Sequence, residues 1–275
     1  SDLIGVPLVT GSTLRIGGDM VIGDRMTGCV GAVGVARELT ARIQSRPGDV
    51  IMVSEGAGGG TVSTTALYFG MHDVVEKTLN VKFLEACEAL FEHNLIGKIH
   101  AMTDVTNGGI RGDAFEIAGT AGVKLVFYEE RLRGLVEPTV LAMLDALKID
   151  YLGVSLDALL IIAPPENADA IMAAVRSRGV NIDVVGKVVG GSGAYLEENG
   201  VERDFTPKFR ESAYTPVKKV VGEEAPMTFE EMKKKVDEAA RHAIEKKERM
   251  VARIKKEQGK PGHSPVKPSR LKSDT

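Results

Sequence analysis

The chain has 275 residues, 43% hydrophobic content and a formal net charge of −3, so it can bury the core of one large domain or two modest ones. Aromatic residues make up only 5%, Trp is absent and Gly occurs 31 times, which argues against an aromatic-lined carbohydrate or single-strand site. This bulk charge gives no reason to expect a nucleic-acid partner. The charge is uneven, because the stretch from Glu223 to the end carries 14 Lys and Arg against 10 Asp and Glu, a net of +4 that leaves −7 for residues 1–222.

Cys29 and Cys87 are far apart and belong to no CxxC pair or Cys/His cluster, so we expect neither a disulfide framework nor a structural zinc site. The five histidines show no HxH or HExxH spacing, which excludes a zincin-type centre. We find no signal peptide and no apolar run of the roughly 18–20 residues that a membrane span needs. We therefore expect a cytoplasmic protein with no membrane partner. The apolar run at residues 3–9 has no initiator Met before it, and we expect the sequence to begin partway through a larger unit.

In chain order, short β-type runs are expected at residues 20–22 and 29–33 and a buried strand at 50–53, after the turn Pro47-Gly48-Asp49. A glycine run at 56–60 follows and leads into a helical stretch. Residues 83–93 have apolar side chains at helical spacing, and Cys87 lies on that face as an expected core residue rather than a nucleophile.

A short strand at 99–102 leads into the loop 103–109, and a helix is expected to follow with Ile110 and Ala121 near its ends. Further strands are expected at 123–128, 158–163, 182–189, 194–196 and 201–205, with Asn199-Gly200 as a hairpin turn. Pro138 should begin one helix, and a second should run from the Pro164-Pro165 pair to about Gly179. This alternation predicts an α+β fold, with helices packed on mixed sheets.

From residue 206 the character changes. Thr228 and Glu231 form a capping-box pattern before a long charged helix that ends near Glu257. Its thin apolar stripe leaves three alternatives open: docking on the body, pairing with a helix of a protein partner, or exposure to solvent. Residues 259–275 are rich in Pro, Ser and Lys and are expected to be disordered.

The loop Thr103-Asp104-Val105-Thr106-Asn107-Gly108-Gly109 is the strongest functional candidate. Glycines let the backbone approach a ligand closely, and a helix start favours phosphate oxygens. A carboxylate at Asp104 is compatible with a phosphate only if a cation bridges the two, and Mg²⁺ suits such hard oxygen ligands. On spacing alone the alternative remains that Asp104 caps the helix and the glycines form a tight turn.

Other motifs give weaker signals. Gly11-Ser12-Thr13 follows an apolar run and forms a second strand-end loop with hydroxyl groups. The run at 56–60 is not a P-loop, because no GxxxxGK[ST] occurs, and it is either a mobile loop or a tight connection. No GxSxG elbow is present, and the residues single out no catalytic group.

Several segments together resemble the aminoimidazole-ribonucleotide-synthetase-related superfamily, which includes selenophosphate synthetase and the HypE-type hydrogenase-maturation factor. Residues 101–110 read AMTDVTNGGI and are similar to the start of its second-domain loop, and residues 5–13, GVPLVTGST, look like a first-domain segment. Residues 46–54, RPGDVIMVS, resemble the junction between the two domains, and 159–166, LLIIAPPE, with 185–188, VGKV, resemble the closing part. These matches stand in the family's order over roughly residues 3–205.

The resemblance implies a division into a remnant of the ATP-binding and dimerisation domain at 1–45, a synthetase-related domain at 46–222, a charged helical tail at 223–258 and a disordered tail at 259–275. It implies ATP and Mg²⁺ as cofactors and a homodimer formed through first-domain strands. The site residues would be Gly11, Ser12, Thr13, Asp104, Thr106, Asn107, Gly108 and Gly109, with Asp104 as the metal ligand.

This chain departs from the pattern of the family in three respects. Position 12 is Ser where relatives often have Gly, Asp, His or Glu, the glycine-rich front half of the first domain is missing, and the tail does not end in Cys. The resemblance implies phosphoryl transfer to an unassigned acceptor, a small molecule or a protein thiol or carboxamide. The alternatives are a non-catalytic nucleotide-binding or scaffold homologue, or the C-terminal fragment of a larger enzyme.

Overall fold

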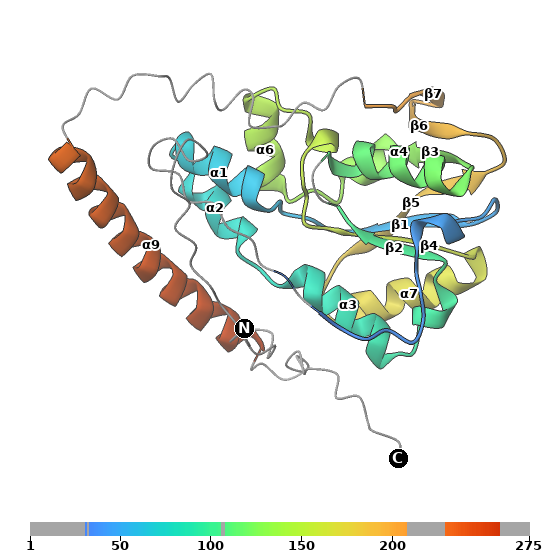
Figure 1. The fold of residues 1–275 in the computed structure, drawn as a ribbon, viewed down its shortest axis with the longest axis horizontal. Helices are drawn as coiled ribbons and strands as arrows, with labels where there is room; N and C mark the ends of the chain where they lie inside the picture. The colour runs from blue at the N-terminus through green and yellow to red at the C-terminus, as the bar shows by residue number, and fades with distance from the viewer. Residues whose placement is uncertain (1–30, 32, 106–107, 208–228, 259–275) are drawn as a thin grey trace, which may run out of the picture.

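The structure is a computed structural model that describes residues 31, 33–105, 108–207 and 229–258 (Figure 1). The run predicted at 20–22, most of the run at 29–33, the cap at Thr228 and the tail at 259–275 lie outside the described residues. Gly31 and Val33, which are described, belong to no strand.

Seven strands form one mixed sheet in the order β2-β4-β1-β5-β3-β6-β7. Neighbouring strands are antiparallel except β3 and β6, which are parallel. The strands are β1 Val50–Ser54, β2 Ala101–Asp104, β3 Lys124–Tyr128, β4 Leu159–Ala163, β5 Ile182–Val189, β6 Gly193–Glu198 and β7 Val201–Asp204.

Helices cover both faces of this sheet. The α-helices of the described residues are α1 Gly60–Tyr68, α2 His72–Thr78, α3 Lys82–Glu92, α4 Gly109–Ala121, α5 Glu129–Arg133, α6 Pro138–Ala146, α7 Pro165–Ser177 and α9 Phe229–Gln258, of which α9 lies against α2 rather than on the sheet. In the described part of the chain, the 3-10 helix η1 Arg42–Gln44 precedes β1, and η2 Ile96–Lys98 and η3 Tyr151–Gly153 lie in connections. The predicted α+β class, with helices packed on a mixed sheet, is confirmed.

Strand alternation divides the core into two layers. Ile51 and Val53 of β1 face the larger layer, which α1, α2, α4 and α6 complete, whereas Met52 faces the smaller layer with α3 and α7 (Figure 1). β4 is buried along its whole length, which explains its uninterrupted apolar sequence. Cys87 packs against the smaller layer, as predicted for a core residue.

Local sequence signals explain two of the connections. Pro138 occupies the first turn of α6, and the Glu137 carboxylate caps this helix by accepting the Val140 N–H at 2.9 Å. Asn199 and Gly200 both have positive φ, 52° and 76°, as a two-residue hairpin turn of the predicted kind requires.

The charged helix α9 docks through its C-terminal half. Met250 and Ile254 are each only 6% exposed. The Lys246 ammonium donates to the carbonyl of His72, and the Arg253 guanidinium to that of Leu79, at the two ends of α2. These residues recur at helical spacing on one face, so of the three alternatives the structure supports docking for this half. No helix among the described residues is both long and apolar enough to cross a membrane.

Candidate functional site

Three connections meet at one edge of the sheet. β1 ends at Ser54 and β2 at Asp104, and both strands are antiparallel to β4, which begins between them at Leu159. The ends of β1 and β2 therefore lie beside the start of β4. The Leu159 N–H donates to the Ser54 hydroxyl at 2.9 Å, which ties two of the connections together.

The glycine run predicted after β1 is a tight connection at this edge. The Gly56 N–H donates to the carbonyl of Leu135 and the Gly58 N–H to that of Leu156, at 3.0 and 2.8 Å. A β-carbon on Gly56 would lie 2.4 Å from the Leu156 carbonyl oxygen, so only glycine allows this approach. Of the two readings that the sequence left open, these contacts favour the tight connection.

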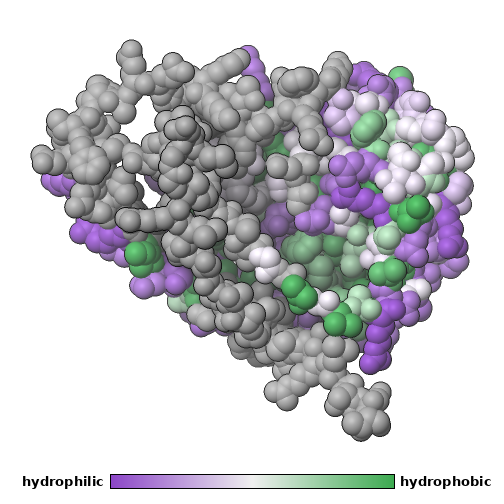
Figure 2. Space-filling model, viewed as in Figure 1, coloured by the Kyte–Doolittle hydropathy of each residue, from purple (hydrophilic) through white to green (hydrophobic). Residues whose placement is uncertain are grey.

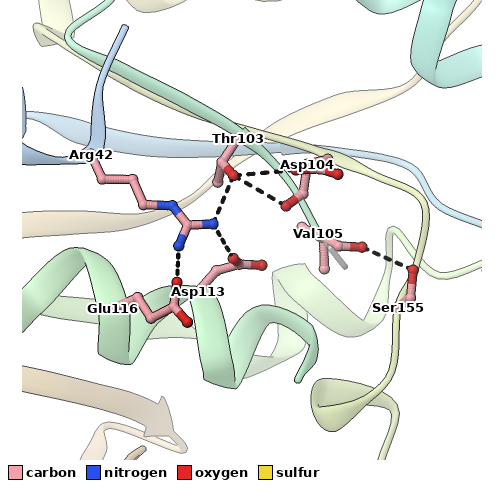
Figure 3. A network of polar contacts seen from close by, with 7 residues as sticks. All are labelled: Arg42, Thr103, Asp104, Val105, Asp113, Glu116 and Ser155. Carbon is pink, nitrogen blue, oxygen red and sulfur yellow. Dashed lines mark hydrogen bonds and ion pairs between the residues drawn. The ribbon is translucent and has the colours of Figure 1, made fainter. Parts of the chain in front are cut away.

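Asp104 is exposed at the end of β2. Its carboxylate accepts from the Thr103 hydroxyl at 3.4 Å, the long end of the hydrogen-bond range. The next residue, Val105, is buried, and its backbone is held by the Ala158 carbonyl and the Ser155 hydroxyl at 2.9 and 3.1 Å (Figure 3). The backbone is thus fixed while the carboxylate faces outward.

The start of α4 is built from glycines. Gly108 is the N-cap residue, with φ 94°, and Gly109 is the first helical residue, with φ 60°. Gly108 has no side chain that could cap the first turn, and an uncapped helix start of this kind favours an anion. Because Gly108 occupies the N-cap position, Asp104 is not the cap of this helix.

Negative charge accumulates around Asp104. Burial, followed by the charges of Asp104 and Glu88, raises the pKa of the Cys87 thiol to about 12. Desolvation, followed by the charge of Asp104, raises the pKa of the Asp157 carboxyl above its ordinary value. Asp157 is the last residue but one before β4, which places it opposite the end of β2. The edge therefore carries two acidic side chains that repel each other, and a cation would relieve that repulsion.

The guanidinium of Arg42 links the strand before the loop to the helix after it. Arg42 of η1 donates to the Thr103 hydroxyl at 2.9 Å and to the Asp113 carboxylate at 2.7 Å, and it pairs with Glu116 as well (Figure 3). Asp113 and Glu116 stand on the same face of α4, three residues apart. Arg42 thus contacts both the strand before the loop and the helix after it.

The structure places some of the predicted site residues together. Asp104, Gly108 and Gly109 lie at this edge, whereas Gly11, Ser12, Thr13, Thr106 and Asn107 lie outside the described residues. Within the described part of the chain, no group of three or more His, Cys, Asp or Glu side chains is arranged to hold a metal ion. Any cation at Asp104 would need ligands from elsewhere, such as a nucleotide phosphate or water.

Two residues at this edge, Asp157 and Arg42, were not predicted from the sequence. Asp157 precedes a predicted strand, so assuming an antiparallel neighbour would have placed it near Asp104. Arg42 carries no local signal, because its partners are 61 to 74 residues away in the sequence.

Comparison with known proteins agrees with this architecture. Residues 46–199 match the family described as AIR synthase related protein, C-terminal domain. An uncharacterized protein of Methanocaldococcus jannaschii is 53% identical over 262 residues, which are 94% of this chain and 57% of that protein. Carbamoyl dehydratase HypE of Rhodobacter capsulatus is 32% identical over 200 residues, 69% of this chain and 56% of that protein.

Two further similarities are more distant and cover less of this chain. Selenide, water dikinase of a Geobacter species is 32% identical over 142 residues, 51% of this chain and 39% of that protein. The crystal structure of E. coli HypE aligns with a TM-score of 0.46 and 22% identity over 60% of this chain and 50% of that one. The chain thus spans little more than half the length of the two curated relatives that it matches over most of its own residues.

Proposed function

The chain belongs to the AIR synthase related family, and we propose that it takes part in ATP- and Mg²⁺-dependent phosphoryl transfer of the synthetase or maturation-factor type. The observation that carries the proposal is the position of Asp104. Its exposed carboxylate stands at the end of β2, one short loop before the glycine start of α4. A helix start attracts phosphate oxygens, and a carboxylate repels them. A bound Mg²⁺ reconciles the two.

In this proposal Asp104 ligates Mg²⁺, and the N–H groups at Gly108 and Gly109 face the phosphates. Burial and the charge of Asp104 raise the pKa of Asp157, and a cation at Asp104 would favour the ionised form of this neighbouring carboxyl. Gly11, Ser12, Thr13, Thr106 and Asn107 are proposed to complete the phosphate contacts. The chemistry would consist mostly of positioning and charge neutralisation, as in other phosphoryl transfers. The name of one relative, selenide, water dikinase, supports this reaction class.

We also propose the division at 1–45, 46–222, 223–258 and 259–275, a cytoplasmic location and a homodimer formed through the first segment. Support for the dimer comes from the described part of that segment. Its aliphatic side chains are strongly exposed: Val33 103%, Val35 79%, Leu39 74% and Ile43 64%. Apolar groups exposed together in this way are typical of an interface. Light scattering on the wild type and on a Val35→Asp, Leu39→Asp variant tests it, and a wild-type monomer would contradict it.

Calorimetric titration of the chain with ATP, ADP and a non-hydrolysable ATP analogue, each with and without Mg²⁺, tests the nucleotide site. We expect ATP to bind only when Mg²⁺ is present. Binding of ATP without phosphoryl transfer to any offered acceptor would instead support the nucleotide-binding or scaffold alternative. Absence of both heat and thermal shift at high Mg²⁺ and ATP would contradict the proposal for this chain.

A further inference from the structure

Arg42 connects parts of the molecule that are remote in sequence. It lies in η1, before the first strand of the sheet, and its partners lie in β2 and α4. The polypeptide around it is also fastened to β2, because the Met102 N–H donates to the Thr40 carbonyl at 3.0 Å. The segment that leads into the sheet is therefore held at the edge where the candidate site lies.

The partners of Arg42 flank the site on both sides. Thr103 immediately precedes Asp104, and the Thr103 hydroxyl that accepts from Arg42 lies 3.4 Å from the Asp104 carboxylate. Asp113 stands one turn after the glycine start of α4, and its side chain is only 5% exposed. One guanidinium thus fixes the end of the strand relative to the start of the helix.

An arginine side chain suits these contacts with Thr103 and Asp113 better than a lysine side chain does. A guanidinium offers donors in a fixed planar fork, whereas a lysine ammonium is a compact point charge on a flexible stem. The contact with Asp113 should dominate, since charge-assisted hydrogen bonds strengthen away from water, while Glu116 is 60% exposed and adds little. The opposite side of the helix start is held by its close packing on η3 at Gly109.

We propose that Arg42 is a positioning residue for the nucleotide site, which holds Asp104 and the start of α4 in their relative places. Arg42 holds these two parts from the segment that precedes the sheet. The geometry of the site therefore depends on that segment being structurally ordered. The effect on nucleotide affinity rests on the function proposed above. The effect of Arg42 on the positions of the end of β2 and the start of α4 does not rest on that function.

The test compares Arg42→Met and Arg42→Lys with wild type and with Lys124→Met. Lys124 is a matched control, because its side chain is 26% exposed against 27% for Arg42 and pairs with Glu202. It lies in β3, four positions away from β2 in the sheet. Hydrogen exchange of the nucleotide-free full chain is measured first, and the affinity for ATP with Mg²⁺ second.

For Arg42→Met we expect the amides of Val105 and Gly112, which donate to the carbonyls of Ala158 and Gly108, to exchange about tenfold faster or more, the factor that loss of a charge-assisted hydrogen bond corresponds to. Amides of β3 and β5 should keep their wild-type rates, and Arg42→Lys should restore part of the protection. Lys124→Met should leave the site amides unchanged. Unchanged site amides in Arg42→Met, or a uniform acceleration over the whole chain, would overturn the positioning role.

The affinity measurement separates this inference from the proposed function. If wild type binds no nucleotide, the proposed function fails, while the exchange data still decide the role of Arg42. If wild type binds ATP with Mg²⁺, we expect Arg42→Met to weaken that affinity by roughly tenfold and Lys124→Met to leave it unchanged. Faster exchange with unaltered affinity would refute the link between Arg42 and the nucleotide site.

Discussion

Gly109 begins α4 directly against the backbone of Leu152: a β-carbon on residue 109 would lie 2.4 Å from the Leu152 carbonyl oxygen. Its φ of 60° is unfavourable for any residue with a side chain. We therefore expect Gly109→Ala to destabilise the fold by about 2–4 kcal/mol, through backbone strain and overpacking together. Urea denaturation followed by circular dichroism measures this loss.

Gly119 in the same helix provides the control. It is exposed, its φ is not positive and a β-carbon there would meet nothing within 4 Å. Gly119→Ala should stabilise the protein by about 0.5–1 kcal/mol, because alanine is the better helix former. Equal effects of the two substitutions would show that α4 does not start in the close packing described.

Asp104→Asn keeps the shape of the side chain and removes its charge. If Asp104 ligates Mg²⁺, the substitution should abolish most of the Mg²⁺-dependent part of ATP affinity, a loss of roughly tenfold or more. Calorimetry with and without Mg²⁺ measures that part directly. Asp169→Asn, at an exposed position on α7, serves as the control and should change nothing. A Mg²⁺ dependence that survives in Asp104→Asn would refute the metal role.

Cys87 provides a chemical probe of the same edge. Burial and the charge of Asp104 raise the pKa of this thiol from 9.0 to about 12, so the native protein contains very little thiolate at pH 8. In a Cys29→Ser background, iodoacetamide should alkylate native Cys87 roughly a hundredfold more slowly than the urea-unfolded chain. Asp104→Asn should speed the native reaction. Equal rates for folded and unfolded protein would contradict the raised pKa.

The raised pKa of the Cys87 thiol also makes the stability of the fold depend on pH. Because the folded pKa lies above the unfolded value, the contribution of the neutral thiol is fully present below about pH 9 and is lost as the pH rises toward 12. Cys87→Ala should therefore flatten the fall in stability over this alkaline window. Urea melts at intervals between pH 8 and 10.5 compare the slopes of variant and parent, and identical slopes would count against the assignment.

The elements with strong periodicity were predictable from the sequence. The continuous apolar run of β4 and the one-faced pattern of α3 appear close to their expected bounds, and so does the turn at Asn199 and Gly200. The short helices α2 and α5 were not predicted, because seven and five residues are too few to show a helical period. The parallel pairing of β3 with β6 was equally inaccessible, since side-chain alternation does not specify a neighbouring strand.

The candidate site was predictable only where its signal is local. Asp104, Gly108 and Gly109 stand together in sequence and in space, so glycine and strand-end chemistry identified them. Arg42 reaches the site only through the packing of η1 on β2 and α4. The charge of Asp104 raises the pKa of Asp157 only because β4 runs antiparallel to β2 and brings the two residues together. Such relationships depend on tertiary topology, which composition and spacing do not determine.

Docking of α9 depends on a few side chains of its C-terminal half. Ile254 is 6% exposed and Ile244, on the same helix, is 56% exposed. Both Ile→Ala changes alter helix propensity equally, so any difference between them reports on contact with the body. Ile254→Ala should weaken docking by about 2 kcal/mol, whereas Ile244→Ala should stay within about 0.5 kcal/mol of the parent.

Local measurements are needed, because α9 can detach while the sheet stays folded. Hydrogen exchange of α9 and α2 should rise together in Ile254→Ala, since the Lys246 and Arg253 contacts tie the two helices. The sheet should keep its parent rates in both variants. If instead Ile254→Ala and Ile244→Ala exchange alike, the C-terminal half of α9 is exposed to solvent. The helix would then be free along its length to engage another protein, as the sequence alone allowed.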